Sequence, residues 1–213
     1  MLKAVMLKTS VIMKCVGLSL MVFVLSLVSV STWGQGIVLL GDNEYAQRCY
    51  RAAENASLLR AASDDDIEQC TLALDIGALK PKDRLATLVN RGILYAAQEN
   101  YAQAKADYER AMQSKNHGGE AYANLGNLYF LLRDYDTAVE NYTKAIDRGM
   151  SRAHVAYLNR GMVFENTRRW SLAQSDYEQA MQLAPEWQKA RELHQRVSLK
   201  LAKQAREASE TTE

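Results

Sequence analysis

Proline and histidine are scarce in this chain, and their scarcity limits both the fold and the chemistry. Two prolines in 213 residues, together with 48% apolar residues, favour a helical globular protein over a disordered one. The three histidines, His117, His154 and His194, form no pair at metal-ligand spacing. The sequence also has no glycine-rich phosphate loop and no nucleophile elbow. We therefore expect no cofactor, no metal and no enzymatic activity.

An excess of basic charge is also missing. The first 34 residues contain three lysines and no acidic residue, followed by an uncharged apolar run from Val16 to Val30 and then small residues. This pattern is typical of a secretory signal peptide, with cleavage after Ser31 or after Gly34. An uncleaved N-terminal anchor is the alternative, and it would be the protein's one contact with a membrane. Residues 35–213 hold 23 basic and 25 acidic residues, which argues against nucleic acid as a partner.

Cysteine is limited to three residues, of which Cys49 and Cys70 lie beyond the leader. An even number in a chain bound for an oxidising compartment predicts one disulfide between them. Two buried thiols are the alternative. Both cysteines fall in a predicted helical hairpin, 43–80, in which Ser63 precedes three aspartates and so predicts a capping box for the second helix.

A pattern of small and aromatic residues recurs about every 34 residues in the rest of the chain. Its anchors are Gly92, Tyr95, Ala104, Tyr108 and Ala111, then Gly126, Tyr129, Ala138, Tyr142 and Ala145, then Gly161, Phe164, Ala173, Tyr177 and Ala180. Such a period predicts pairs of helices that bury their apolar faces by stacking on their neighbours. Glycine and alanine at the crossings would allow close approach, and the tyrosines would fill the core.

These residues resemble the tetratricopeptide repeat, which implies an all-α, right-handed superhelical solenoid of helix-turn-helix repeats. The implied repeats are 85–118, 119–152 and 154–187, and 43–80 resembles a degenerate first repeat. A capping helix is expected over 185–206, followed by a disordered tail at 207–213. The chain departs from the family pattern in lacking the usual glycine in the turn between the two helices of each repeat.

Arginine and aspartate occur together in the first and third repeats and are both absent from the second. Arg91 accompanies Asp107 and Arg160 accompanies Asp176, whereas the middle repeat has Leu125 and Asn141 in those places. The shared pattern predicts that each arginine pairs with the aspartate of its own repeat, as a partly buried ion pair that fixes helix register. An arginine that recognises a ligand is the alternative.

By similarity to the family, the first helix of each repeat would line a concave groove for a protein or peptide segment. The predicted groove residues are Val89, Asn90, Ile93, Ala123, Asn124, Asn127, Phe130, Leu131, Leu158, Asn159, Met162 and Asn166. The asparagines could equally satisfy neighbouring helix ends. Val89 and Ile93 stand where one branch of the family uses polar residues to hold an acidic carboxyl terminus, so that activity is not expected.

The sequence therefore predicts a non-enzymatic protein-interaction module of the bacterial cell envelope, periplasmic or secreted, that binds a partner segment in an apolar groove. The alternative localisation is an inner-membrane anchor with the repeats in the periplasm. The alternative function is an assembly subunit, a homo-oligomer or a protein whose groove is filled by its own N-terminal region.

Overall fold

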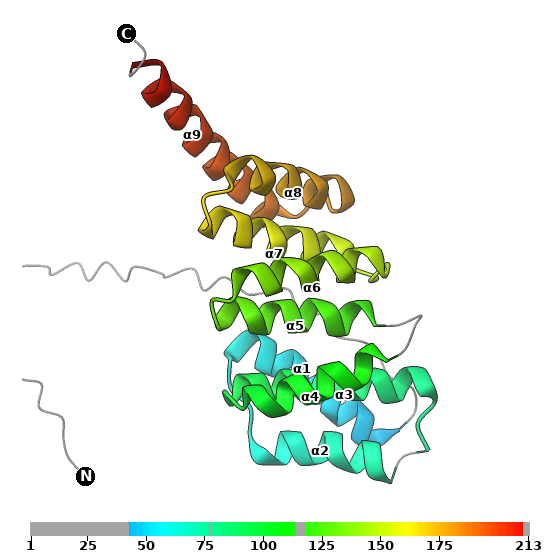
Figure 1. Ribbon diagram of the computed structural model, residues 1–213. Coiled ribbons are helices and arrows are strands. Elements are labelled where there is room, and N and C mark those ends of the chain that lie inside the picture. The colour runs from blue at the N-terminus through cyan, green and yellow to red at the C-terminus, as the bar shows by residue number, and fades with distance from the viewer. Residues whose placement is uncertain (1–42, 77, 114–117, 211–213) are drawn as a thin grey trace, which may run out of the picture. The chain divides into compact units, whose positions relative to one another are not determined.

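The computed structural model describes residues 43–76, 78–113 and 118–210. The predicted leader, residues 1–34, and residues 211–213 lie outside this range. The described part of the chain contains nine α-helices and no strand (Figure 1). The helices are α1 (Glu44–Leu59), α2 (Asp64–Asp75), α3 (Pro81–Ala97), α4 (Tyr101–Met112), α5 (Gly119–Leu131), α6 (Tyr135–Asp147), α7 (Ala153–Asn166), α8 (Trp170–Leu183) and α9 (Gln188–Glu210). The predicted all-α repeat fold is confirmed.

Consecutive helices pack as antiparallel pairs, α1 with α2, α3 with α4, α5 with α6 and α7 with α8. In the three pairs that follow α1 and α2, the glycine of the first helix lies against the tyrosine ring of the second helix. A Cβ atom added to Gly126 would lie 2.8 Å from the Tyr142 ring, and one added to Gly161 would lie 2.7 Å from the Tyr177 ring. Both contacts are too short for a side chain, so the repeated glycines are required by this packing.

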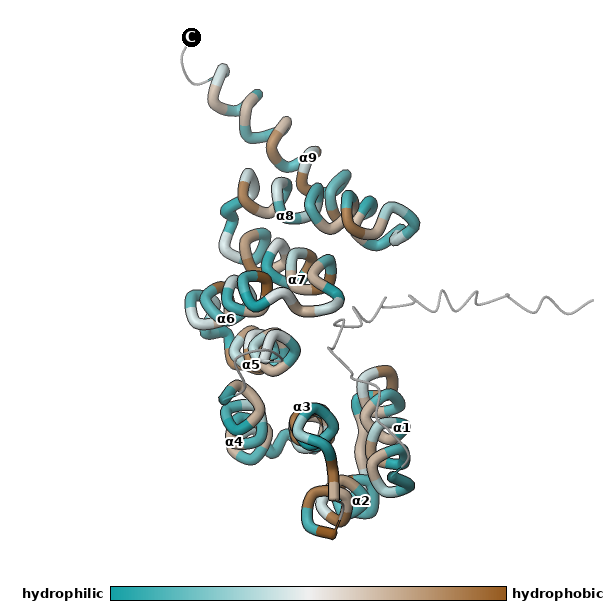
Figure 2. The backbone as a smooth tube through the Cα atoms, turned by 90° about the vertical axis from the view of Figure 1, so that its right-hand side faces the viewer, coloured by the Kyte–Doolittle hydropathy of each residue, from teal (hydrophilic) through white to brown (hydrophobic). Residues whose placement is uncertain are grey.

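The first helices of successive pairs also pack on one another, α1 on α3 and α3 on α5. Figure 2 shows α3 between α1 and α4, with α5 above them, and α1, α3 and α5 are all first helices of their pairs. The turns between first and second helices lie along one edge of the stack in Figure 1. Residues at these turns are therefore brought near the ends of α1, α3 and α5.

Each of these turns contains a non-glycine residue in the left-handed backbone region. Glu99, Arg133 and Arg168 have φ of 62°, 61° and 58°, and Arg60 has φ of 52° after α1. They occupy the position at which the family usually has glycine. A residue with a Cβ costs roughly 1 kcal/mol in this conformation, because Cβ approaches the following carbonyl oxygen.

The N-terminal hairpin, formed by α1 and α2, is stabilised by helix caps and by the contact between two cysteines. Asn43 caps α1 through its side chain, and Ser63 and Asp66 form the predicted capping box at the start of α2. Cys49 of α1 and Cys70 of α2 are fully buried and lie in disulfide contact, with a Cα–Cα distance of 4.7 Å. The hairpin packs its inner face on α3.

The C-terminal helix differs from the sequence prediction at both ends. It begins at Gln188 rather than Pro185, because residues 184–187 form a turn in which the Trp187 N–H donates to the Ala184 carbonyl. It continues to Glu210, so residues 207–210, which were expected in a disordered tail, are helical. Three apolar residues, Ala190, Leu193 and Val197, bury one face of α9 on the last repeat.

Candidate functional site

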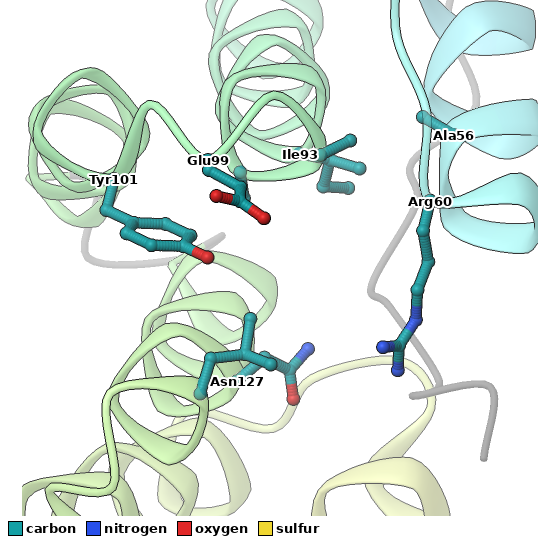
Figure 3. Close-up of a pocket in the computed structure, with 9 residues that line it drawn as sticks. Ala56, Arg60, Ile93, Glu99, Tyr101 and Asn127 are labelled. Atoms are coloured by element: carbon teal, nitrogen blue, oxygen red, sulfur yellow. The ribbon is translucent and has the colours of Figure 1, made fainter. Parts of the chain in front are cut away.

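A pocket of about 150 Å³ opens between the ends of α1, α3 and α5 and the start of α4. Its apolar wall is made of Ala56, Ile93, Ala96, Ala97 and Leu131, and its polar groups belong to Arg60, Glu99, Tyr101 and Asn127. Figure 3 shows Asn127 across the pocket from Glu99, with Arg60 and Tyr101 on its two sides. We call these nine residues the α1–α5 pocket.

The pocket shares three residues with the groove that the sequence predicted. Ile93, Asn127 and Leu131 line it. Arg60, Glu99 and Tyr101 were not predicted, because they come from turns or a helix start rather than from the faces of the first helices. The available signal was the repeat register, which places Glu99 and Arg133 at the same turn position in successive repeats.

Most of the predicted groove residues are inaccessible. Eight of the twelve are buried: Val89, Asn90, Ile93, Ala123, Asn124, Asn127, Leu158 and Asn159. Leu131 and Asn166 are exposed, and Phe130 and Met162 are half-buried. The recurring asparagines Asn90, Asn124 and Asn159 are all buried, so a partner can reach only part of the predicted surface.

The buried asparagines instead form a polar network centred on Asn127. The Asn127 Oδ1 accepts hydrogen bonds from the Tyr142 hydroxyl at 2.7 Å and from the Asn159 Nδ2 at 2.9 Å. The Asn127 Nδ2 lies 3.5 Å from the Asn124 Oδ1, and the Asn124 Nδ2 donates to the Glu120 carbonyl at 2.9 Å. The network links α5 to α6 and α7, so these amides stabilise the contact between two repeats.

The two arginine–aspartate pairs are brought together by the fold. Arg91 donates to both carboxylate oxygens of Asp107, at 2.7 and 2.8 Å, and Arg160 does the same to Asp176, at 2.8 Å for both bonds. These bonds raise the pKa of each guanidinium above its ordinary value, against the opposing effect of burial. The pairs lie within the helix packing, which supports their structural role rather than ligand recognition.

Each arginine also reaches the preceding repeat, which the sequence pattern did not indicate. Arg91 donates to Thr71 on α2 at 3.0 Å, and Arg160 donates to Thr143 on α6 at 2.8 Å. The arginine thus connects three helices from two repeats. In the middle repeat the corresponding Leu125 is buried against Tyr108 and Leu128, so an apolar contact replaces this connection.

A buried carboxylate joins the last repeat to α9. Glu165 on α7 accepts hydrogen bonds from Arg196, Lys200 and Tyr177, at distances between 2.7 and 2.8 Å. Burial by itself would raise the pKa of Glu165, but the bonds from Arg196, Lys200 and Tyr177 outweigh it and lower the pKa. Because two of its partners, Arg196 and Lys200, lie more than thirty residues away on a helix outside the repeat pattern, sequence periodicity could not reveal this site.

Within residues 43–76, 78–113 and 118–210, no group of three His, Cys, Asp or Glu side chains is arranged to hold a metal ion. None of the helices in these described ranges is long and apolar enough to cross a membrane. The α1–α5 pocket offers a ligand an apolar wall and a few polar side chains.

Comparison with known protein families gives two overlapping matches, both described as tetratricopeptide repeat. One covers residues 83–149 and the other residues 124–190. Together they cover the three repeats that the anchor residues define.

Comparison with curated proteins identifies partial relatives. The chain is 34% identical over 70 residues to the heat shock protein STI1 of Saccharomyces cerevisiae, which is 33% of this chain and 12% of that protein. It is 29% identical over 118 residues to the lipoprotein NlpI homolog of Haemophilus influenzae, which is 54% of this chain and 37% of that protein. The chain therefore spans well under half the length of these two relatives.

Solved structures show the same fold at low sequence identity. A MamA RS-1 double mutant superposes with a TM-score of 0.54 at 16% identity, covering 81% of this chain and 93% of that one. MamA AMB-1 superposes with a TM-score of 0.51 at 16% identity, covering 74% and 82%. At such identities the likeness concerns the arrangement of helices alone.

Proposed function

The chain belongs to the tetratricopeptide repeat family, and on that premise we propose that it binds a segment of another protein in the α1–α5 pocket. The segment places an apolar side chain against Ile93 and Leu131, and the polar groups around the wall orient its backbone. Binding is the whole activity, with no chemical step. The observation that carries the proposal is the pocket itself, since it combines apolar lining with a few convergent polar groups.

The burial pattern supports a short contact rather than one that extends along all three repeats. The predicted asparagines of the first and third repeats, Asn90 and Asn159, are fully buried, so a partner cannot form hydrogen bonds with their amides. Accessible apolar surface is found at Leu131, which is 45% exposed, and at the half-buried Phe130. An extended segment that crosses the pocket would bury both.

We place this activity in the bacterial cell envelope, with the repeats in the periplasm or secreted. Three features support the placement: the leader-like pattern of residues 1–34, the buried Cys49–Cys70 pair, and the relative that is a lipoprotein. A disulfide formed there would be preserved, because the periplasm is oxidising. If residues 1–34 remain attached, the same repeats would be held at the inner membrane.

A matched pair of leucine variants tests the pocket. Leu131 and Leu132 are adjacent and similarly exposed, at 45% and 51%, but only Leu131 lines the pocket. The test is a pull-down from the cell envelope with immobilised wild type, Leu131→Glu and Leu132→Glu. A partner that depends on the pocket should be retained by wild type and Leu132→Glu and lost by Leu131→Glu. Equal capture by all three proteins would rule out the pocket as the binding site.

Light scattering on the purified protein separates this function from an assembly role. A binding module with an accessible pocket should be monomeric, and Leu131→Glu should leave its mass unchanged. A stable dimer that Leu131→Glu converts to a monomer would instead show that the pocket is an interface between two copies.

A further inference from the structure

A second pocket, of about 300 Å³, lies between the two helices of the N-terminal hairpin. It is lined by Arg48, Arg51, Ala52 and Asn55 of α1 and by Asp65, Asp66 and Gln69 of α2. None of these seven residues lines the α1–α5 pocket, so the two pockets are separate. We call the seven residues the hairpin pocket.

Opposite charges line the two sides of the hairpin pocket. The α1 side has two arginines, Arg48 and Arg51, which are three residues apart and therefore share one face of the helix. The α2 side has two aspartates, Asp65 and Asp66, from the first turn of that helix. Within the described part of the chain, neither arginine forms an ion pair with either aspartate, and Arg48 pairs instead with Glu44 of its own helix at 2.6 Å. The pocket thus keeps its positive and negative sides apart.

The disulfide contact limits how far the two sides of the pocket can move. It holds the backbones of Cys49 and Cys70 at a Cα–Cα distance of 4.7 Å. Arg48 directly precedes Cys49 and Gln69 directly precedes Cys70, so one residue on each side is adjacent to this contact. Ala52 adds only a methyl group to the lining, which leaves room between the charged side chains.

Both aspartates keep a carboxylate oxygen for a ligand. Asp66 uses Oδ2 in the capping box, where it accepts from the Ser63 N–H at 2.8 Å and from the Ser63 hydroxyl at 2.7 Å. Asp65 uses Oδ1 to accept from the Gln69 Nε2 at 3.4 Å. Their other oxygens accept no hydrogen bond from a described residue, and the buried Gln69 Oε1 also has no such partner. The α2 side therefore presents acceptors that lack donors.

We propose that the hairpin pocket binds a small zwitterion, with its carboxylate on Arg48 and Arg51 and its ammonium group on Asp65 and Asp66. The guanidinium donors match the geometry of a carboxylate, and an ammonium group has three donors to share between carboxylate oxygens. A ligand with one charge would pair with one side of the pocket only. This site is independent of the proposed binding of a protein segment in the α1–α5 pocket.

The test is a nuclear magnetic resonance titration of the purified, isotope-labelled protein at pH 7 and low ionic strength. The probes are glycine, 4-aminobutyrate and 6-aminohexanoate, in which the ammonium and carboxylate groups are progressively further apart, with butylamine and butyrate as single-charge controls. The readouts are the backbone amide signals of Asp65 and Asp66 and the Nε–H signals of Arg48 and Arg51. Ligands of this size should bind in the millimolar range. We expect one zwitterion to shift the signals of both sides along one binding curve, about fivefold more tightly than either control.

Two variants remove one charge from each side of the hairpin pocket. Arg51→Gln should weaken zwitterion binding several-fold and leave butylamine binding unchanged, and Asp65→Asn should weaken it similarly and leave butyrate binding unchanged. Arg51 is exposed and has no ion pair with a described residue, so its replacement should not affect folding. The matched control is Asp64→Asn, because Asp64 belongs to the same first turn of α2 but does not line the pocket. It should bind the zwitterion like wild type.

The outcomes separate this site from the α1–α5 pocket. Equal affinity for the zwitterions and the single-charge controls would overturn the proposal, and so would an equal loss in Asp64→Asn and Asp65→Asn. No shift of the hairpin signals with any zwitterion at high millimolar concentration would also overturn it. The methyl signals of Ile93 and Leu131 in the α1–α5 pocket should stay in place, so these negative results would leave the proposed function untouched. Methyl shifts without hairpin shifts would place the zwitterion in the wrong pocket and overturn the inference.

Discussion

Arg91 on α3 holds Asp107 on α4 through two parallel hydrogen bonds of 2.7 and 2.8 Å, and both side chains are nearly buried, at 12% and 4% exposure. Two charges removed from water are compensated here by each other and, for Arg91, by Thr71 on the preceding repeat. The loss of one member would leave the other charged and buried, which costs more than the pair contributes.

Asp107→Ala should therefore destabilise the protein by about 3 kcal/mol, measured by urea denaturation at pH 7. The middle repeat supplies the matched control, because it has leucine and asparagine at the equivalent positions, Leu125 and Asn141. The double variant Arg91→Leu with Asp107→Asn removes both charges and should lose less than Asp107→Ala alone. An Asp107→Ala protein that unfolds at the wild-type urea concentration would refute the structural importance of the pair.

Glu165 should make the attachment of α9 sensitive to acid. Its pKa in the folded protein is below the ordinary value of 4.5, because the bonds from Arg196, Lys200 and Tyr177 stabilise the carboxylate. The stabilisation is then complete above about pH 4.5 and is lost as the pH falls through the lower, folded pKa. Amide hydrogen exchange in α9 should accelerate over that range before exchange in α5 does.

The variant Glu165→Gln checks the cause of this acid sensitivity. It should cost about 2 kcal/mol at neutral pH, since hydrogen bonds to a charged group are replaced by weaker neutral ones. It should also flatten the acid dependence of exchange in α9. A control is Glu178→Gln, whose carboxylate is half exposed and lies 3.1 Å from the His194 Nε2. If the two variants show the same pH profile, Glu165 does not control the attachment.

The turn residues predict a stabilising change. Arg133 has φ of 61°, so Arg133→Gly relieves the Cβ contact while the Arg133 N–H keeps its bond to the Phe130 carbonyl. We expect a gain of about 0.5 kcal/mol after the greater flexibility of glycine in the unfolded chain is subtracted. Arg148, the residue after α6, has φ of −81°, so Arg148→Gly has no strain to relieve and should lose stability. Thermal melting of both variants checks the sign.

The fold could be predicted from the sequence because the residues that determine it repeat. Gly126 and Tyr142 recur with the same spacing in each repeat, and their contact is a direct consequence of helix pairing. Arg91 and Asp107 were predicted to pair because both are missing from the middle repeat. Patterns that recur within one chain thus predicted packing and its polar contacts.

The candidate site was harder to predict from the sequence because it depends on features that do not repeat. Asn90 and Asn159 share a sequence position with Asn124, yet burial removes all three from solvent, and burial depends on how neighbouring helices pack. Glu99 lines the pocket because its turn is left-handed, and no glycine marked that turn. Residue identity alone could not distinguish an amide that lines a pocket, such as Asn127, from one buried between repeats, such as Asn159.

The disulfide contact between Cys49 and Cys70 gives the last prediction. A bond there would close a loop of 21 residues between α1 and α2, and limiting the unfolded chain in this way would contribute about 3 kcal/mol. Both cysteines are fully buried, so a reductant should act slowly on the folded protein and quickly in denaturant.

Replacing both cysteines by alanine should lower the melting temperature without changing the helical signal at 20 °C, as measured by circular dichroism. The helical signal is kept because α1 and α2 keep their caps and their packing on α3. Thiol titration of the denatured, unreduced protein provides the control: recovery of both Cys49 and Cys70 as free thiols would contradict the bond, and the double alanine variant would then melt close to wild type.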